Sequence, residues 1–194
     1  MKTIFAAAVI ILGATLTAGC SDGLSVTASA ATEEASASRV ERGKYIVTMV
    51  GCSDCHTPFK MGPKGPEPDM DRFLSGHPEQ IGALKAPAVS GPWMSATSAT
   101  NTAFSGPWGI SYTANLTPDQ NTGLGIWTEE MFLKAIRTGR HMGVSREILP
   151  PMPWPSFRNA TDEDLKSIYA YLRSIKPIVN HVPDVTPPAP APVQ

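Results

Sequence analysis

Cys52, Cys55 and His56 form the feature that most constrains this chain of 194 residues. Two cysteines that are separated by two residues and followed at once by a histidine make up the attachment pattern of a c-type haem. The spacing suits that chemistry because each thiol can form a thioether with one haem vinyl group, while the short Ser53-Asp54 bridge keeps both sulfurs on one edge of the ring. His56 is then carried under the ring, where its imidazole can take one axial position on the iron.

Two other kinds of site also use paired cysteines. A structural zinc site normally takes four protein ligands, and the sequence has no second Cys pair. A redox-active Cys-x-x-Cys usually accompanies a βαβ pattern, which this sequence lacks. The sequence therefore predicts one haem c, bound covalently through Cys52 and Cys55.

Residues 1–19 have the pattern of a signal peptide. Lys2 gives a positive start, residues 4–12 are apolar, and small residues lead to Cys20. The apolar run is too short to span a bilayer as a mature helix. The closing Leu-Thr-Ala-Gly-Cys resembles a bacterial lipobox, although Thr17 stands where leucine is usual. We expect Cys20 to be the lipidated first mature residue of a periplasmic protein anchored at the membrane. The alternative is ordinary cleavage that leaves Cys20 a free thiol.

The rest of the chain divides into helical and irregular stretches. Residues 20–38 are small and polar without an apolar period, so we expect a flexible tether. Amphipathic helices are predicted in residues 39–50, after the N-cap Thr128 and after the N-cap Thr161. The Pro-rich residues 178–194 are expected to be a disordered tail.

Residues 57–110 are predicted to be an irregular insertion. Their many prolines exclude a long helix. A structureless stretch of this length is unusual, so we expect it to have a packed form of its own or to serve a partner. Two turns should anchor it, Leu74-Ser75-Gly76-His77 and the turn at 104–109, with Trp93, Phe104 and Trp108 as apolar pegs. His77 is expected to be a surface turn residue rather than an iron ligand.

Composition excludes some functions. The formal net charge is -1 and no long basic run occurs, so nucleic-acid binding is not expected. The chain contains 19 Pro and 16 Gly but only 7% aromatic residues, which indicates a large share of loops.

With its order of helix, haem motif, loop, helix, Met-bearing loop and helix, the sequence resembles the class I c-type cytochromes. The resemblance covers about residues 40–177 and implies an all-α domain over residues 39–177, with three or more helices around a covalent haem and long loops rich in Pro and Gly. The sequence is also similar to the cytochrome c subunits of membrane-associated bacterial dehydrogenases. Those subunits often have three haem motifs, whereas this chain has one. The motifs that carry both resemblances are CSDCH, ANLTPD, GIWTEE and PPMPW, with Phe157 and the helix start at 161–164.

The resemblance also implies site residues. Met152 occupies the place of the sixth iron ligand, and Trp127 that of a tryptophan near a haem propionate. The carbonyl of Ala114 would accept the Nδ1 proton of His56. Met142 competes with Met152, but the prolines around Met152 stiffen its segment, which then loses less entropy on ligation. We therefore predict His56 and Met152 as the two iron ligands.

Such an iron has no open position, which predicts electron transfer and not catalysis. The expected function is a single-haem carrier between a periplasmic or membrane-associated dehydrogenase and a respiratory acceptor. One alternative is a haem enzyme or gas sensor with a five-coordinate iron, for which Arg140 and His141 are the only distal candidates. Another is an adaptor protein whose insertion at 57–110 binds a dehydrogenase.

Overall fold

The computed structural model describes residues 22–87 and 92–188. The chain divides into two units at the boundary between Ala35 and Ser36, and the haem motif lies in the second. The predicted signal peptide and Cys20 lie outside the described residues. Within the described ranges, no helix is both long enough and apolar enough to cross a membrane.

The first helix, α1, runs over Asp22–Met49 and ends beside the haem motif. The amphipathic helix predicted for residues 39–50 is its C-terminal part. Residues 22–38, which we expected to be a flexible tether, are helical in the structure. This segment contains no proline, and its Ala and Glu residues favour a helix, although its Ser and Thr residues do so less and it has no apolar face.

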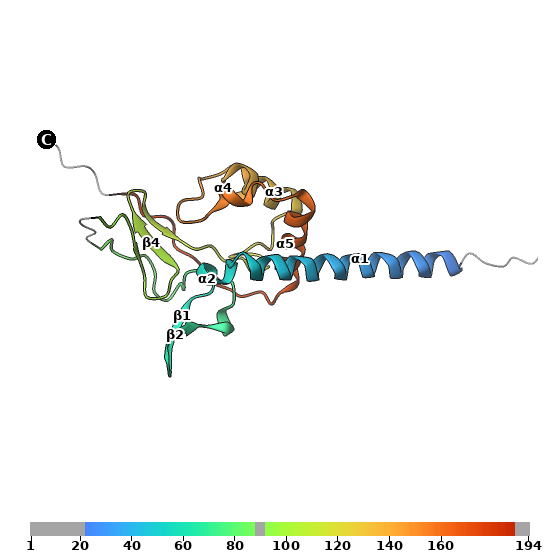
Figure 1. The fold of residues 1–194 in the computed structure, drawn as a ribbon, viewed down its shortest axis with the longest axis horizontal. Coiled ribbons are helices and arrows are strands. Elements are labelled where there is room, and N and C mark those ends of the chain that lie inside the picture. Colours follow the sequence, from blue (N-terminus) through green and yellow to red (C-terminus); the bar gives the residue numbers. More distant parts are fainter. Residues whose placement is uncertain (1–21, 88–91, 189–194) are drawn as a thin grey trace, which may run out of the picture. The chain divides into compact units, whose positions relative to one another are not determined.

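The predicted middle and last helices are both present (Figure 1), as α3 (Glu129–Thr138) and α5 (Asp162–Ser174). Each begins at the threonine expected to cap it, and the hydroxyl of that threonine accepts a backbone hydrogen bond from the residue three positions on. Gly139 ends α3 in the left-handed conformation, with φ of 68°. The remaining helices are short: α2 (Cys52–His56), α4 (Trp154–Phe157), and the 3₁₀ turns η1 (Met70–Arg72) and η2 (His141–Gly143).

The main core joins α1, α3 and α5. Gly43 marks the place where α1 meets α5, because a Cβ atom there would lie 2.5 Å from the carbonyl carbon of Ser167 and 2.8 Å from Cβ of Tyr171. This close approach brings the apolar faces of the helices together. The buried residues of the cluster are Val47, Leu74, Leu124, Phe132, Ile136, Leu165 and Leu172.

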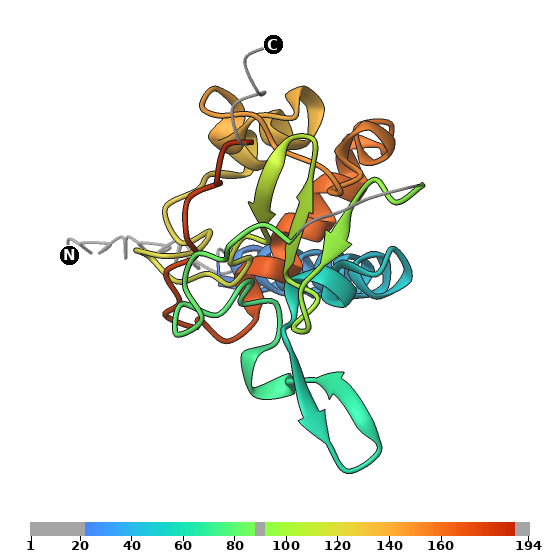
Figure 2. The same ribbon diagram turned by 90° about the vertical axis from the view of Figure 1, so that its left-hand side faces the viewer.

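Two small antiparallel sheets make the expectation of an all-α domain wrong in part. One pairs β1 (Phe59–Gly62) with β2 (Gly65–Pro68). The other has the order β3-β4-β5, from β3 (Ala96–Thr97), β4 (Ala103–Gly106) and β5 (Gly109–Tyr112) (Figure 2). All these strands lie within residues 57–112, so the Pro-rich insertion has the packed form that its length led us to expect. Short strands joined by tight turns satisfy its backbone where helices cannot form.

The anchors of the insertion differ from the expectation. Phe104 is buried as predicted, but the side chain of Trp93 is 75% exposed and is not an apolar peg. His77, expected at the surface, is fully buried. Its Nδ1 lies 2.9 Å from the hydroxyl of Thr102, and its Nε2 lies 3.0 Å from the carbonyl oxygen of Gly82. Both ring nitrogens therefore have protein partners.

The C-terminal segment up to residue 188 is packed against the domain, so the predicted disordered tail is wrong for residues 178–188. Asn180 is buried, its amide donates to the carbonyls of Ser75 and His77, and its side-chain oxygen accepts from the backbone N–H of Glu79. Farther on, Thr186 forms a β-bridge with Ile110. These hydrogen bonds hold in place a Pro-rich segment that forms neither a helix nor a regular strand.

Candidate haem site

The imidazole of His56 is held in one orientation. It is buried at the end of α2, and its Nδ1 donates to the carbonyl oxygen of Ala114 at 2.8 Å. Burial lowers the pKa of His56, an effect that the hydrogen bond to Ala114 partly offsets, so the ring is neutral near pH 7. With the proton on Nδ1, Nε2 carries the free lone pair, and no described residue hydrogen-bonds to it. A neutral imidazole fixed in this way is prepared to bind a metal through Nε2.

A turn at residues 74–77 joins His56 to the segment of Ala114. The N–H of Gly76 donates to the carbonyl of His56 at 2.8 Å, and the N–H of His77 donates to the carbonyl of Thr113 at 3.0 Å. Gly76 has φ of +78°, and a Cβ atom there would lie 2.6 Å from the carbonyl carbon of Ala114. Only glycine fits this close approach. Sequence reasoning treated this stretch as an anchored turn and missed its role in positioning; its glycine was the one available signal.

The two thiols precede His56 on the same short helix. Cys52 and Cys55 are unpaired and half-buried. Burial, reinforced by the charge of Asp54, raises the pKa of Cys52 to about 11 and also raises the pKa of Cys55. The described part of the chain holds no cluster of three or more His, Cys, Asp or Glu that could bind a metal ion.

The predicted distal residues lie on the loops between α3 and α5. Met152 is half-buried just before α4, and the carbonyl of Pro150 accepts a 2.5 Å hydrogen bond from the hydroxyl of Ser111. Met142 is also half-buried, in η2, with an unusual positive φ of 54°. The competition between the two methionines is therefore not decided by burial.

The other candidates on this side have protein partners. Trp127 packs against the main core, and its ring meets that of His141 edge-on at 5.0 Å. Arg140 bonds to the carbonyl of Ser145 at 3.1 Å and pairs with Glu147 at 3.5 Å. Both bonds hold the guanidinium on its own loop.

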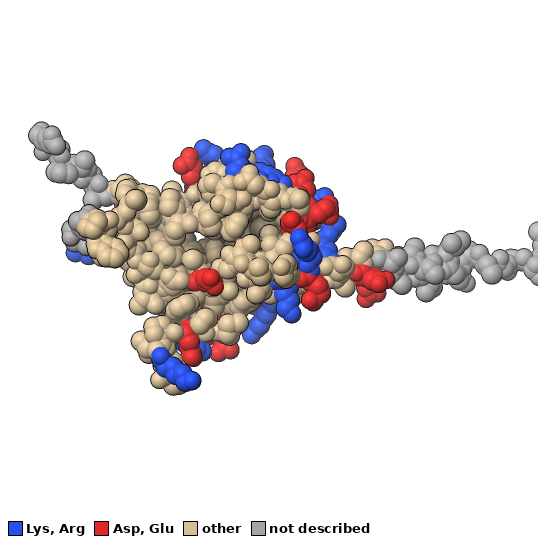
Figure 3. All heavy atoms as spheres, in the orientation of Figure 1, with Lys and Arg blue, Asp and Glu red and all other residues tan. Residues whose placement is uncertain are grey.

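A hollow is visible near the middle of the surface in Figure 3, where α2 lies on one side and the loop before α4 on the other in the same view. The atoms around it are mostly uncharged, whereas Lys, Arg, Asp and Glu gather toward α1, α3 and α5 and at the β1–β2 hairpin. A hollow with mostly uncharged surroundings suits an apolar macrocycle.

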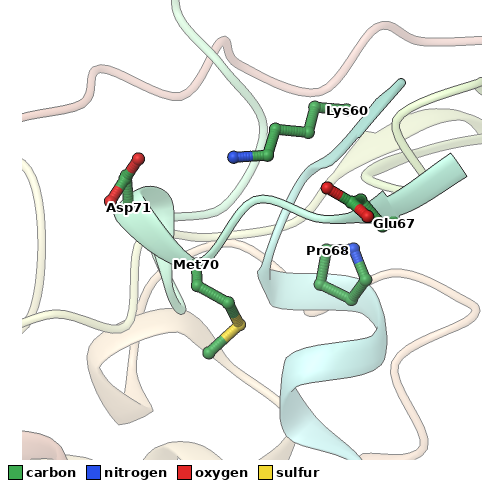
Figure 4. A pocket seen from close by; sticks show the side chains of 5 residues that line it. All are labelled: Lys60, Glu67, Pro68, Met70 and Asp71. Atoms are coloured by element: carbon green, nitrogen blue, oxygen red, sulfur yellow. The ribbon is translucent and has the colours of Figure 1, made fainter. Parts of the chain in front are cut away.

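A separate pocket of about 380 Å³ lies beside the β1–β2 hairpin (Figure 4). Lys60 reaches into it between Glu67 and Asp71 and pairs with Asp69 at 3.0 Å. None of the haem-motif residues lines this pocket, whose wall is formed by Lys60, Glu67, Pro68, Met70 and Asp71.

The residues present fit a covalently bound haem c. The fit rests on two observations: the Nε2 of an oriented, neutral His56, and two unpaired thiols on the same helix. Cys52 and Cys55 would hold the haem, and His56 would bind its iron.

Comparison with known proteins identifies the family. The family model described as Cytochrome c matches residues 40–176. Over 140 residues the chain is 30% identical to the fructose dehydrogenase cytochrome subunit of Gluconobacter japonicus, covering 72% of this chain and 22% of that protein. The alcohol dehydrogenase (quinone), cytochrome c subunit, of Gluconobacter oxydans is 29% identical over 160 residues, covering 80% and 26%. The gluconate 2-dehydrogenase cytochrome c subunit of Pantoea cypripedii is 29% identical over 152 residues, covering 78% and 26%.

The chain thus spans about a quarter of the length of these relatives. The matches confirm the resemblance to c-type cytochromes and to the cytochrome subunits of bacterial dehydrogenases. With its CSDCH motif inside the matched range, the chain belongs to the cytochrome c family of electron-transfer proteins.

Proposed function

We propose that this chain is a single-haem c-type cytochrome whose iron is held by His56 and Met152, and that it carries electrons from a dehydrogenase to a respiratory acceptor. The observation that carries the proposal is the orientation of His56. Its Nδ1–H is committed to the carbonyl of Ala114 at 2.8 Å, and its Nε2 remains available. Such a bond also raises the basicity of the ligand.

Each residue has a defined task in this proposal. The haem, when bound, supplies reversible one-electron chemistry. Cys52 and Cys55 hold the ring against α2, and the 74–77 turn keeps His56 aligned with Ala114. The sulfur of Met152 closes the sixth position, which keeps substrates and small ligands off the iron. A thioether ligand in apolar surroundings favours the ferrous state and raises the potential.

The donor is proposed to be a dehydrogenase. The relatives named above are cytochrome subunits of dehydrogenases for fructose, alcohol and gluconate. Because these substrates differ while the cytochrome sequence is shared, the chain would receive electrons without contacting the substrate. Membranes that contain the dehydrogenase should then reduce the purified protein only after a dehydrogenase substrate is added. Reduction that does not depend on any such substrate would contradict this part of the proposal.

The protein is proposed to be periplasmic and attached to the membrane by a lipid on Cys20. The support comes from the lipobox-like sequence that ends at this residue. A lipid anchor would raise the effective concentration of the haem domain near membrane partners. Mass spectrometry of the mature N-terminus should find an acylated cysteine, and Cys20→Ser should move the protein to the soluble periplasmic fraction. An unmodified Cys20 would contradict the anchor.

The ligand set is tested by optical titration of the reduced protein with carbon monoxide. The spectrum of the wild type should not change, because both axial positions are filled. Met152→Ala should open the iron and bind carbon monoxide, whereas the matched control Met142→Ala should behave as the wild type does. If Met142→Ala opens the site instead, the assignment of Met152 is wrong. If the wild type itself binds carbon monoxide readily, the carrier function gives way to a sensor or enzyme with an open iron.

A further inference from the structure

The segment that carries Met152 has few backbone N–H groups with which to hold itself in place. Pro150, Pro151 and Pro153 surround Met152, and proline has no N–H. The N–H of Met152 bonds within the segment, to the carbonyl of Leu149 at 3.4 Å. The three prolines are exposed, so burial does little to hold them. Such a segment must be tied to the rest of the domain chiefly through its carbonyl groups.

Both ends of this segment are attached to the C-terminus of α3. On one side, the N–H of Ile148 donates to the carbonyl of Gly139 at 2.8 Å. On the other side, a Cβ atom on Gly139 would lie 2.7 Å from Cδ2 of Trp154, so the indole packs directly on that glycine. Residues 149–153 form the loop between these two attachments and carry Met152.

Among the described residues, a single hydrogen bond joins residues 149–153 to an element outside residues 139–160. In this bond the hydroxyl of Ser111 donates to the carbonyl of Pro150 at 2.5 Å. The hydroxyl has only one proton to donate, and its alternative acceptor, the carbonyl of Phe104, is farther away at 3.4 Å. The proton of Ser111 is therefore committed to the loop that carries Met152.

Ser111 is held firmly because β5 has a neighbour on each side. The register pairs Ser111 with Phe104 of β4. On the opposite edge, Ile110 exchanges two backbone hydrogen bonds with Thr186, at 2.8 and 2.9 Å. Ser111 itself is buried. A buried donor on a strand with partners on both sides is a more precise support than a donor on a loop.

We propose that Ser111 is the positioning residue that keeps the sulfur of Met152 on the iron; this inference rests on the proposed function. Ser111 acts through the backbone of the distal loop and not by contact with the iron. Without its bond to Pro150, the loop gains conformations in which the sulfur is away from the iron, and ordering it again costs more entropy. The β4–β5 hairpin of the insertion thereby helps to keep the sixth position closed.

The test uses the ferric haem-loaded protein and imidazole, which binds the iron only when Met152 has left it. The apparent affinity for such a ligand is proportional to the fraction of molecules in the open state. Ser111→Ala should raise the apparent affinity for imidazole by about tenfold, which is about 1.4 kcal/mol and within the range of one hydrogen bond. Ser111→Thr keeps the hydroxyl and should bind imidazole as the wild type does.

Ser105→Ala is the matched control. Ser105 is a buried serine on the neighbouring strand β4. Its register partner Ile110 belongs to the cluster on the other face of the sheet, so this variant should bind imidazole as the wild type does. Equal imidazole affinities of Ser111→Ala and Ser105→Ala would overturn the inference. So would a Ser111→Ala protein that is less stable to denaturant but unchanged in imidazole affinity, because the hydroxyl would then serve folding alone.

A double-mutant cycle shows whether Ser111 acts through Met152. Once Met152→Ala has opened the iron, adding Ser111→Ala should leave the imidazole affinity unchanged. A further tenfold rise would mean that Ser111 controls access to the iron in another way, and would overturn this inference alone. If Met152→Ala binds imidazole no better than the wild type, the proposed function fails instead, because Met152 is then not the ligand.

A second variant keeps the test decisive if Ser111→Ala does not fold. Ser111→Cys is close to serine in size, and a thiol is only a weak donor. This variant should also raise the imidazole affinity above that of the wild type, with one haem per chain confirmed by mass spectrometry. An unchanged affinity would overturn the inference.

Discussion

Replacing Gly43 with alanine tests the packing on which the whole haem domain depends. On an open helix this change is stabilising, since alanine is favoured over glycine by about 1 kcal/mol. Here the new methyl group would lie 2.5 Å from the carbonyl carbon of Ser167 and 2.8 Å from Cβ of Tyr171. Carbon atoms pack best at about 3.5–4 Å, so α1 and α5 would have to move apart by about 1 Å.

A gap of this size weakens every contact across the helix interface, including those of Val47 with its neighbours in the core. Overpacking typically costs about 1–3 kcal/mol. The backbone of α5 cannot turn aside as a side chain would, so we take the upper end of that range. After the gain in helix propensity, the expected net loss is about 2 kcal/mol.

The assay is denaturant unfolding of the oxidised haem protein, followed by far-ultraviolet circular dichroism. Gly43→Ala should lower the unfolding midpoint without changing the slope. Lys44→Ala is the matched control, because it changes a neighbouring exposed position of the same helix. A Gly43→Ala protein as stable as the wild type, or more stable, would refute the close contact between α1 and α5.

Two further predictions concern the insertion and the C-terminal segment. Asn180→Ala should destabilise the domain by about 2–4 kcal/mol, because it removes three hydrogen bonds and leaves buried backbone groups unpaired. Alanine at the exposed Asn121 is the control. Equal unfolding midpoints for the two alanine variants would contradict the packing of the C-terminal segment. Burial lowers the pKa of His77, and the hydrogen bond to Gly82 opposes this effect in part. The His77 imidazole therefore binds a proton more readily in the unfolded state than in the folded state. Stability should therefore be lost as pH falls below the ordinary value of about 6.5, and unfolding measured at about pH 7.5 and 5.5 should show a smaller loss in His77→Gln than in the wild type. An equal loss in both proteins would mean that His77 does not titrate on unfolding.

The parts of the fold that the sequence predicts are those governed by local rules. Thr128 and Thr161 cap their helices as expected, and the haem motif follows a helix. The hydrogen bond between His56 and Ala114 is the contact implied by the resemblance. In each case the signal is a short spacing or a familiar motif.

The parts that the sequence does not predict depend on partners far along the chain. His77 is buried because Thr102 and Gly82 satisfy its ring, and the tail is ordered because Asn180 bonds to residues about a hundred positions away. No period or composition reveals such pairings. The strands in the insertion are equally hidden, because stretches as short as four residues carry too little alternation to be recognised.

The central claim is that this chain carries single electrons on one closed haem. It is tested most directly by a redox titration of the purified protein under argon and under carbon monoxide, with the electrons counted per chain. We predict one electron per chain, a single reversible midpoint, and the same midpoint in both gases. A ligand that binds only one redox state shifts the equilibrium toward that state. A midpoint that rises under carbon monoxide would therefore show an open ferrous iron, and would contradict the account.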